Sequence, residues 1–329
     1  MSGPTGALKH VQSSMESVAG LAKGLYARAP ASTATLLSLL LSYLITTARS
    51  DYVLYRSLGV GGLAPPGPIG WLVHTFILRP LAMSSGREKD PERLPVSDEQ
   101  VQGQSLSLDL PKRKGNAPFT FGLMPHRQLD QTLPEDGAMQ KTMQALASHF
   151  NKLATLNVNL RPSISVLEAH NSPSLQVQHS PKDISATQIH SYARLFLSGL
   201  HAPRSDVSSP LKEFAHIHLH DGSLHLVLSP SHARIVLAQG WGELHRLAGA
   251  FYRGHWWPLF ILPKWLANDA KARWGYLAQR AQSSSKAVLL PPTYLMIYAP
   301  RDEEELQHVK RIIDAAAAFA LGHEPISEP

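Results

Sequence analysis

The chain has 329 residues, of which 43% are hydrophobic and 17% charged, enough for one large domain or two small ones. This composition excludes a disordered, highly charged chain. The lack of cysteines excludes disulfides, thiolate zinc sites, iron–sulfur clusters and a cysteine nucleophile. A formal net charge of +6 is too small to indicate nucleic-acid binding, so we expect no nucleic-acid partner. The unusual feature is the number of histidines, 17.

Residues 29–48 form the first predicted element, a stretch without charge between Arg28 and Arg49. Such a stretch is long enough to span the hydrocarbon core of a bilayer. We therefore predict a single-pass membrane anchor here, after an N-terminal segment of residues 1–28, with membrane lipid as a partner. A signal peptide fits less well, because no cleavage site of small residues follows. The flanking basic residues leave the orientation open, and we favour an endomembrane location, the ER.

Residues 49–109 are predicted to be a membrane-proximal segment and a linker. Glycine and proline interrupt a second uncharged stretch, so that only Ile69 to Leu78 can be helical. This run is too short to cross a bilayer. It is either an interfacial or re-entrant segment or a buried helix that docks the anchor on the domain. Charged residues among prolines indicate a surface loop from Ser84 to Pro118.

Residues 110–329 are predicted to form an α+β domain with an antiparallel sheet. Apolar residues at three- and four-residue spacing predict an amphipathic helix from Ala138 to Leu156. Ser229-Pro230 and Gly240 mark the two ends of another helix, and Asp302 caps the last one. The other predicted elements are strands at 164–167, 175–178, 214–220, 223–229 and 294–298 and a helix at 188–200. Hairpins flanked by separate helices are typical of the α+β class.

Asp221-Gly222 lies between two alternating segments and predicts a β-hairpin with a two-residue turn. This register pairs His218 with His225. Because side chains alternate along a strand, one face would collect four imidazoles. These are His216, His218, His220 and His225.

Two kinds of chemistry fit this histidine face, and the residues alone leave both open. Neutral imidazoles can bind a divalent metal, and the His216-x-His218 spacing resembles the start of a cupin metal motif. The glutamate that follows in that motif is absent, since Gly222 occupies its position. Imidazoles with a pKa near neutrality can instead act as general bases on an acidic enol.

A series of spaced motifs runs through most of the chain. The densest are Glu213-Phe-Ala-His216-Ile-His218, Leu224-His225-Leu226, Gly240-Trp241-Gly242 with His245, Leu247-Ala248-Gly249, and Tyr298-Ala299-Pro300-Arg301 followed by Glu303-Glu304-Glu305. Weaker matches are Glu168-x-His170, Arg127-Gln128 and Asp51-Tyr52. Together they resemble the fungal luciferase family, the enzymes of luminous mushrooms and their non-luminous relatives.

The resemblance implies an anchored oxygenase that adds O2 to a hydroxylated α-pyrone, 3-hydroxyhispidin, after which a peroxide intermediate loses CO2. No tightly bound organic cofactor is implied, and O2 is the co-substrate. In this picture His218 and His225 remove a proton and His216 orients the substrate. Arg301 holds the enolate or peroxide anion, unless it pairs with Glu303 or Glu304 at the start of the following helix. The substrate-binding candidates are Trp241, His245, Tyr298 and His170.

We favour a site without a tightly bound metal; the ligands of a metal, if one binds, are His216, His218 and His225. The reason is weak carboxylate support, since Glu213 is odd-spaced from His216 and points to the opposite face unless a bulge intervenes. The alternative function is a membrane-anchored ligand- or metal-binding protein that keeps the fold without oxygenase activity. The oligomeric state is left open.

The chain departs from the family at residues 250–292, where an insertion replaces a shorter link. This segment holds four of the six tryptophans and six basic residues against a single acidic one, Asp269. Tryptophan beside lysine and arginine is typical of a segment at a membrane surface, and packing onto the chain's own domain is the alternative. Because the insertion adjoins the site, we expect a hydroxypyrone or similar enolizable phenolic substrate and no light emission.

Overall fold

The structure, a computed structural model, describes residues 16–17, 19–21, 23–24, 26–59, 67–94, 108–129, 137–165, 168, 172–178, 211–248, 290 and 293–326. The chain divides into two compact units, Met1–Ser57 and Leu58–Pro329. The predicted helix at 188–200, the candidate His170 and, apart from Leu290, the insertion at 250–292 lie outside the described residues.

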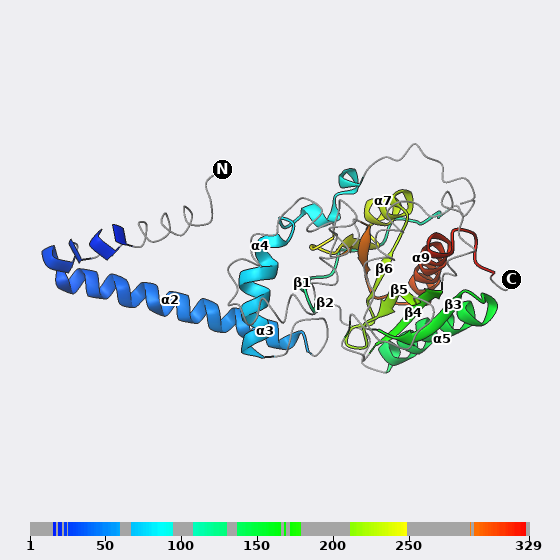
Figure 1. The fold of residues 1–329 in the computed structure, drawn as a ribbon, viewed down its shortest axis with the longest axis horizontal. Coiled ribbons are helices and arrows are strands. Elements are labelled where there is room, and N and C mark those ends of the chain that lie inside the picture. Colours follow the sequence, from blue (N-terminus) through cyan, green and yellow to red (C-terminus); the bar gives the residue numbers. More distant parts are fainter. Residues whose placement is uncertain are drawn as a thin grey trace. The chain divides into compact units, whose positions relative to one another are not determined.

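The first unit contains helix α2, Pro30–Ser57, with 28 residues (Figure 1). The helix is longer than the predicted stretch of residues 29–48, because no proline or glycine follows until Gly59. Its apolar side chains are largely exposed, with Leu36 at 67% and Tyr43 at 68%. By length and composition α2 can cross a membrane.

The second unit is built around a six-stranded antiparallel sheet in the order β3-β4-β5-β6-β8-β7. Its strands are β3 Leu160–Ile164, β4 Pro173–Gln178, β5 Leu211–Ile217, β6 Leu224–Val227, β7 Gly242–Leu244 and β8 Tyr294–Ile297. A separate pair, β1 Thr120–Gly122 and β2 His126–Gln128, is also antiparallel. Together with the helices below, this sheet confirms the α+β class.

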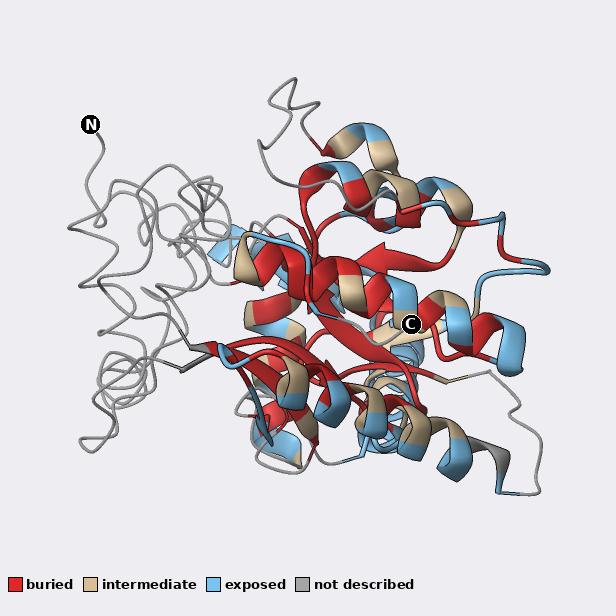
Figure 2. Ribbon diagram, turned by 90° about the vertical axis from the view of Figure 1, so that its right-hand side faces the viewer, coloured by how far each residue is buried: buried red, intermediate tan, exposed pale blue. Residues whose placement is uncertain are grey.

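Two long helices cover one face of the sheet. Helix α5, Ala138–Leu156, has the predicted bounds, and α9, Glu303–Leu321, contacts both α5 and strand β5. Buried apolar residues alternate along β5 and β6, namely Ala215, Ile217, Leu224 and Leu226. The strands and the inner sides of the helices are buried in Figure 2. The other face of β5 and β6 is left to the histidines.

Helix α7, Pro230–Gln239, packs against β7 and has the predicted ends. The Ser229 side chain accepts a hydrogen bond from the His232 backbone N–H, which caps the first turn. Gly240 ends the helix at φ 75°, a left-handed conformation that favours glycine. The helix predicted from these local signals is confirmed.

A further helical segment runs from Pro68 to Leu81, with α3 Pro68–Val73, a π-helical turn η1 His74–Leu78 and α4 Arg79–Leu81. Gly70, His74 and Leu78 are buried. Ile69 and Phe76 are apolar and exposed, at 60% and 65%. The segment therefore combines one buried side with an exposed apolar side, and it is slightly longer than the predicted helix from Ile69 to Leu78.

The segment predicted as a loop from Ser84 to Pro118 contains two short 3₁₀ helices, η2 Arg87–Lys89 and η3 Pro91–Arg93. It is also partly buried, because Leu108, Leu110 and Arg113 lie in the interior. The described part of this stretch therefore contributes to the core. Its charged and proline-rich composition did not indicate this.

The connection between β5 and β6 corrects the predicted hairpin. His216, not His218, lies opposite His225. The His218 backbone N–H donates to the Ser223 carbonyl, so the loop holds four residues instead of two. The predicted turn is wrong because Asp221 accepts hydrogen bonds from the backbone N–H groups of Ser223 and of the distant Gln128. His220 is consequently exposed, outside the histidine face.

Candidate functional site

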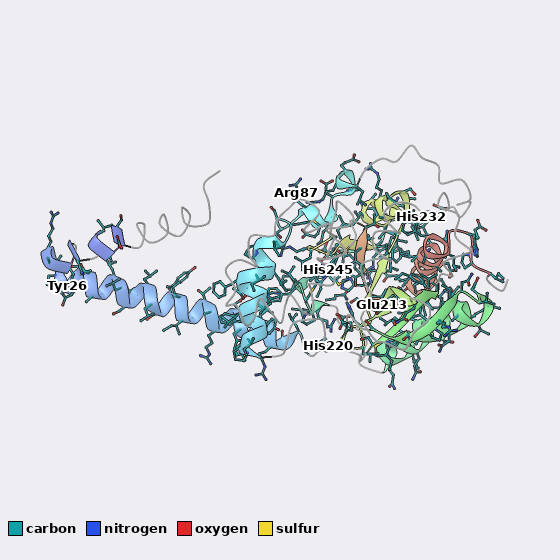
Figure 3. All side chains as sticks on the ribbon, in the orientation of Figure 1. Tyr26, Arg87, Glu213, His220, His232 and His245 are labelled. Atoms are coloured by element: carbon teal, nitrogen blue, oxygen red, sulfur yellow. The ribbon has the colours of Figure 1, made fainter. Side chains whose placement is uncertain are left out.

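Five histidines gather on the face of the sheet opposite α5 and α9. Their ring centroids lie 4.7 Å apart for His218 and His225, 5.3 Å for His216 and His225, 5.2 Å for His225 and His245, and 5.0 Å for His126 and His245. None of these side chains is more than 3% exposed. Figure 3 labels His245 of this group, together with Glu213 and with His220, which lies outside the group. We call His126, His216, His218, His225 and His245 the histidine cluster.

The Nδ1 atoms of three cluster histidines are held by acceptors. His216 Nδ1 lies 2.8 Å from Glu213 Oε1, and His225 Nδ1 lies 3.0 Å from the Leu295 carbonyl. His218 Nδ1 lies 2.8 Å from Ser223 Oγ, whose hydroxyl donates to Asp221. Because these partners accept, the proton of each ring belongs on Nδ1 and the lone pair on Nε2.

Glu213 reaches His216 because of a β-bulge. Leu175 pairs with Ala215 while Gln176 pairs with Glu213, which leaves Phe214 as the extra residue of β5. A bulge of this kind changes the side to which the following residues point. The sequence predicts that Glu213 points away from His216 unless a bulge lies between them. The bulge is present, so the Glu213 carboxylate lies on the same side as the histidines.

The Nε2 atoms of His216 and His218 lie near a carboxylate from another segment of the chain, Glu168. Both Nε2 atoms are buried and have no hydrogen-bond partner among the described residues. Glu168 Oε1 lies 3.8 Å from the Nε2 of His216 and 3.7 Å from that of His218. Its other oxygen accepts from Arg127 Nη2 at 2.5 Å. The sequence contains Glu168 only as a weak match to the family.

Burial sets the charge of the cluster. It lowers the pKa of His218 to about 4, and the pKa values of His225 and His245 also fall well below the ordinary value. These imidazoles are therefore neutral at pH 7. Burial by itself raises the pKa of Glu168, but the hydrogen bond from Arg127 and the charge of its guanidinium help to bring it below the ordinary value, so this carboxylate is ionised.

His245 differs from the three histidines above because both of its nitrogens are engaged. Its Nε2 lies 2.7 Å from the Leu123 carbonyl, and its Nδ1 accepts the Leu247 backbone N–H at 3.1 Å. A ring held at both ends cannot offer a lone pair without breaking a hydrogen bond. His245 therefore forms a wall of the site.

Glu243 on β7 is a second buried carboxylate, which the sequence motifs did not single out. It accepts hydrogen bonds from Thr120 Oγ1 at 2.6 Å and Tyr298 Oη at 2.9 Å, and it lies 3.3 Å from His126 Nε2. Burial opposes its ionisation, but the hydrogen bond and charge of His126 lower its pKa. Glu243 follows Gly242 of the Gly-Trp-Gly motif directly, which is the signal that could have found it.

A small cavity of about 20 Å³ opens against the cluster, room for a water molecule, O2 or an ion. The residue after β1 and the start of β2 form one side of it, and strands β5, β6 and β8 form another. Its lining residues are Leu123, Met124, Pro125, His126, Glu168, His216, His225, His245, Leu290 and Tyr294. The Tyr294 ring stacks on His225 at a centroid distance of 4.8 Å.

Residues 211–316, which hold most of the cluster, match the family model described as the luciferase domain. Over these residues the chain is similar to the luciferase domain, and its wider similarity also points to that family. It is 26% identical over 279 residues to the luciferases of Armillaria ostoyae and Armillaria gallica, covering 82% of this chain and 80% of each relative. The luciferase of Neonothopanus nambi is 23% identical over 283 residues with the same coverage. No solved structure matches this chain significantly.

The luciferase domain brings together four of the predicted site residues, His216, His218, His225 and His245. Arg301 lies elsewhere, at the start of α9, where its side chain donates to Glu305 and to the Lys114 carbonyl. The pairing with a helix glutamate that the sequence offered as the alternative is therefore present, although the partner is Glu305 rather than Glu303 or Glu304.

Two other predicted residues do not line the cavity. Trp241 is a core residue whose Nε1 donates to the Pro111 carbonyl at 2.7 Å, and it does not line the cavity. Tyr298 is buried and donates to Glu243, and burial raises the pKa of its hydroxyl far above the ordinary value. Of these two, Tyr298 is connected to the cluster, through Glu243 and His126.

Proposed function

We propose that this luciferase-domain protein is an O2-dependent oxygenase of a small hydroxypyrone or similar enolizable phenolic compound. The observation that carries the proposal is a cavity lined by four histidines and Glu168 in a chain similar to proteins named luciferases. The cavity has room for O2 beside His225 and Glu168. We expect no light emission, because the insertion at 250–292 distinguishes this chain from the family pattern.

The proposed reaction needs no further co-reactant. A carbon of the enolate forms a bond to O2, which takes up two electrons from the substrate, and the proton released from the enol ends on the distal oxygen as a hydroperoxide. His225 and Glu168 line the cavity and are unprotonated at pH 7, so either can accept this proton first. His218 is not among the lining residues, and we therefore assign it to positioning instead of proton removal.

The cation available to an anionic intermediate is Arg127 instead of Arg301. Its guanidinium pairs with Glu168 of the cavity wall. Arg301 has its own partners at the start of α9. Arg127 does not line the cavity, so we propose that it keeps Glu168 ionised and supplies positive charge behind that carboxylate.

The test is oxygen uptake by the purified full chain with a panel of hydroxypyrones. We expect uptake with at least one of them, and a loss of at least about a hundredfold in His225→Gln, because loss of a general base or positioning group costs about 10²–10⁴ in rate. His220→Gln is the matched control, since His220 is exposed on the neighbouring loop, and it should keep full activity. A folded chain that consumes no oxygen with the whole panel would refute the proposal.

The alternative is a binding protein that keeps the fold without oxygenase activity. The small size of the cavity favours it, because about 20 Å³ holds an ion but no pyrone ring unless side chains move. Calorimetry with the same hydroxypyrones separates the two functions. Saturable binding without oxygen uptake would establish the alternative.

A further inference from the structure

The arrangement of imidazole nitrogens and carboxylates in the cluster suits a metal ion. His216, His218 and His225 each offer one nitrogen, and the three atoms lie within 4.8 Å of one another. We propose that the luciferase domain binds one divalent transition-metal ion through the Nε2 atoms of His216, His218 and His225, with Glu168 as the fourth ligand. The inference rests on this geometry and does not depend on the proposed reaction.

The first argument is the orientation of the rings. Metal-bound histidines almost always donate their other N–H to a carboxylate, carbonyl or similar acceptor, which fixes the ring. All three histidines show this pattern, with Glu213, Ser223 and the Leu295 carbonyl as acceptors. Three separate acceptors thus turn three lone pairs toward one another.

The second argument is the lack of any other partner for two of these lone pairs. The Nε2 atoms of His216 and His218 are fully buried, and no described residue forms a hydrogen bond with them. Leaving buried polar atoms without a partner is unfavourable and uncommon in folded proteins. Coordination of a shared ion satisfies both atoms at once.

The third argument is the carboxylate of Glu168, whose position beside the histidines the sequence did not indicate. Glu168 Oε1 lies 3.7 and 3.8 Å from the two Nε2 atoms. Ligand bonds of about 2.1 Å place tetrahedral ligand atoms roughly 3.4 Å apart, so a small contraction completes the site. The Glu168 backbone N–H donates to Ser165 Oγ, which donates in turn to Glu213, so Glu168 and His216 share one network.

Charge around the three histidines also favours a cation. Among the described residues, the carboxylates of Glu168, Glu213 and Asp221 lie beside them, against the guanidinium of Arg127. A divalent ion would neutralise this excess of negative charge. Imidazole donors with one carboxylate suit iron, zinc, copper and nickel better than calcium or magnesium.

A second set of nitrogens, from His126, His225 and His245, is a poorer site. His245 already uses Nδ1 and Nε2 in hydrogen bonds, so it would have to give one up to bind an ion. The two sets share His225, which prevents simultaneous occupation through the same atom. Of the two sets, the geometry therefore favours the one that contains His216 and His218 as the ligands of the proposed ion.

The experiment measures metal in the full-length chain, purified in detergent without an affinity tag, and then titrates Zn²⁺ and Co²⁺ into the chelator-treated protein by calorimetry. We expect one equivalent of metal per chain. Bound Co²⁺ should give the visible absorption band of a four-coordinate ion. His218→Gln and Glu168→Gln should weaken binding by more than the ten- to hundredfold typical of losing an indirect partner. His220→Gln and His245→Gln should bind as the unmodified chain does.

Several outcomes would overturn the inference. They are the absence of stoichiometric binding by the folded, unmodified chain, equal binding by all variants, and loss of binding in His245→Gln but not in His218→Gln. Circular dichroism of each variant reports folding. Glu213→Gln keeps all four proposed ligands and changes only the acceptor of His216 Nδ1, so its binding should weaken less than that of His218→Gln. Oxygen uptake is measured separately, so bound metal without uptake refutes the proposed function alone, and uptake without metal refutes this inference alone.

Discussion

Glu305 connects the start of α9 to the segment that precedes β1. Its carboxylate accepts from Arg113 Nη2 at 3.1 Å, and it also accepts the backbone N–H and side chain of Arg301. Burial raises the pKa of Glu305, but the hydrogen bonds from Arg301 and the charge of Arg113 lower it more, so its pKa is below the ordinary value of 4.5. A lowered folded-state pKa stabilises the fold above the unfolded-state pKa, and this stability is lost as the pH falls through the folded-state value.

Glu305→Gln tests this residue. At pH 7 the variant should lose about 1–3 kcal/mol of unfolding free energy, because hydrogen bonds to a charged partner are lost. Below the ordinary glutamate pKa the difference from the unmodified chain should shrink, since the native carboxylate becomes protonated there too. Chemical unfolding at several pH values measures both. Glu304→Gln, which removes only an exposed pair with Lys114, should change stability by less than about 1 kcal/mol, and a pH-independent effect of Glu305→Gln would contradict the assignment.

At the scale of elements, α9 is defined by residues at its own ends. Asp302 Oδ1 accepts the Glu305 backbone N–H at 2.8 Å, and Gly322 ends the helix at φ 78°. Glu303, Glu304 and Glu305 in the first turn also suit the positive end of the helix dipole. These signals are local, which is why they could be recognised without knowledge of the fold.

We expect Asp302→Ala to destabilise the protein by about 1 kcal/mol, because the first turn loses its capping acceptor. Asp302→Ser keeps an acceptor at the same position and should restore most of the loss. The midpoints of chemical unfolding of the two variants provide the measurement. Equal destabilisation by alanine and serine would show that Asp302 acts through something other than the cap.

For the molecule as a whole, the feature that suggests a location is helix α2. It is long and apolar, and most of its side chains are exposed within the structure. The helix from Pro68 to Leu81 adds an exposed apolar side at Ile69 and Phe76. We propose that α2 anchors the chain in a membrane, and the endomembrane location stays a prediction that cell fractionation tests.

Alkaline extraction of membranes tests the anchor. The unmodified chain should remain with the membrane pellet. A variant with Leu40→Lys and Leu41→Lys should be released in larger part, because a lysine at the centre of a spanning helix costs about 2.5–3.5 kcal/mol. Ser38→Ala is a control within the same helix and should remain in the pellet. Full release of the unmodified chain would exclude a spanning anchor.

Features that depend on neighbouring residues could be predicted before the fold was known. The bounds of α5, the caps of α7 and α9 and the α+β class follow from periodicity and capping within a few turns, and the structure confirms them. The family was also recognisable from its spaced motifs, because these motifs keep their residue types in order along the chain.

Which side chains meet in the site could be seen only in the folded chain. The β5–β6 register depends on Asp221 accepting from Gln128, and Glu213 joins His216 through a bulge. Glu168 comes to the histidines from a different segment of the chain, and so does His126. Contacts of this kind depend on strand pairing and loop closure between distant segments, whose energies are summed over the whole fold, so that no short stretch of sequence specifies them.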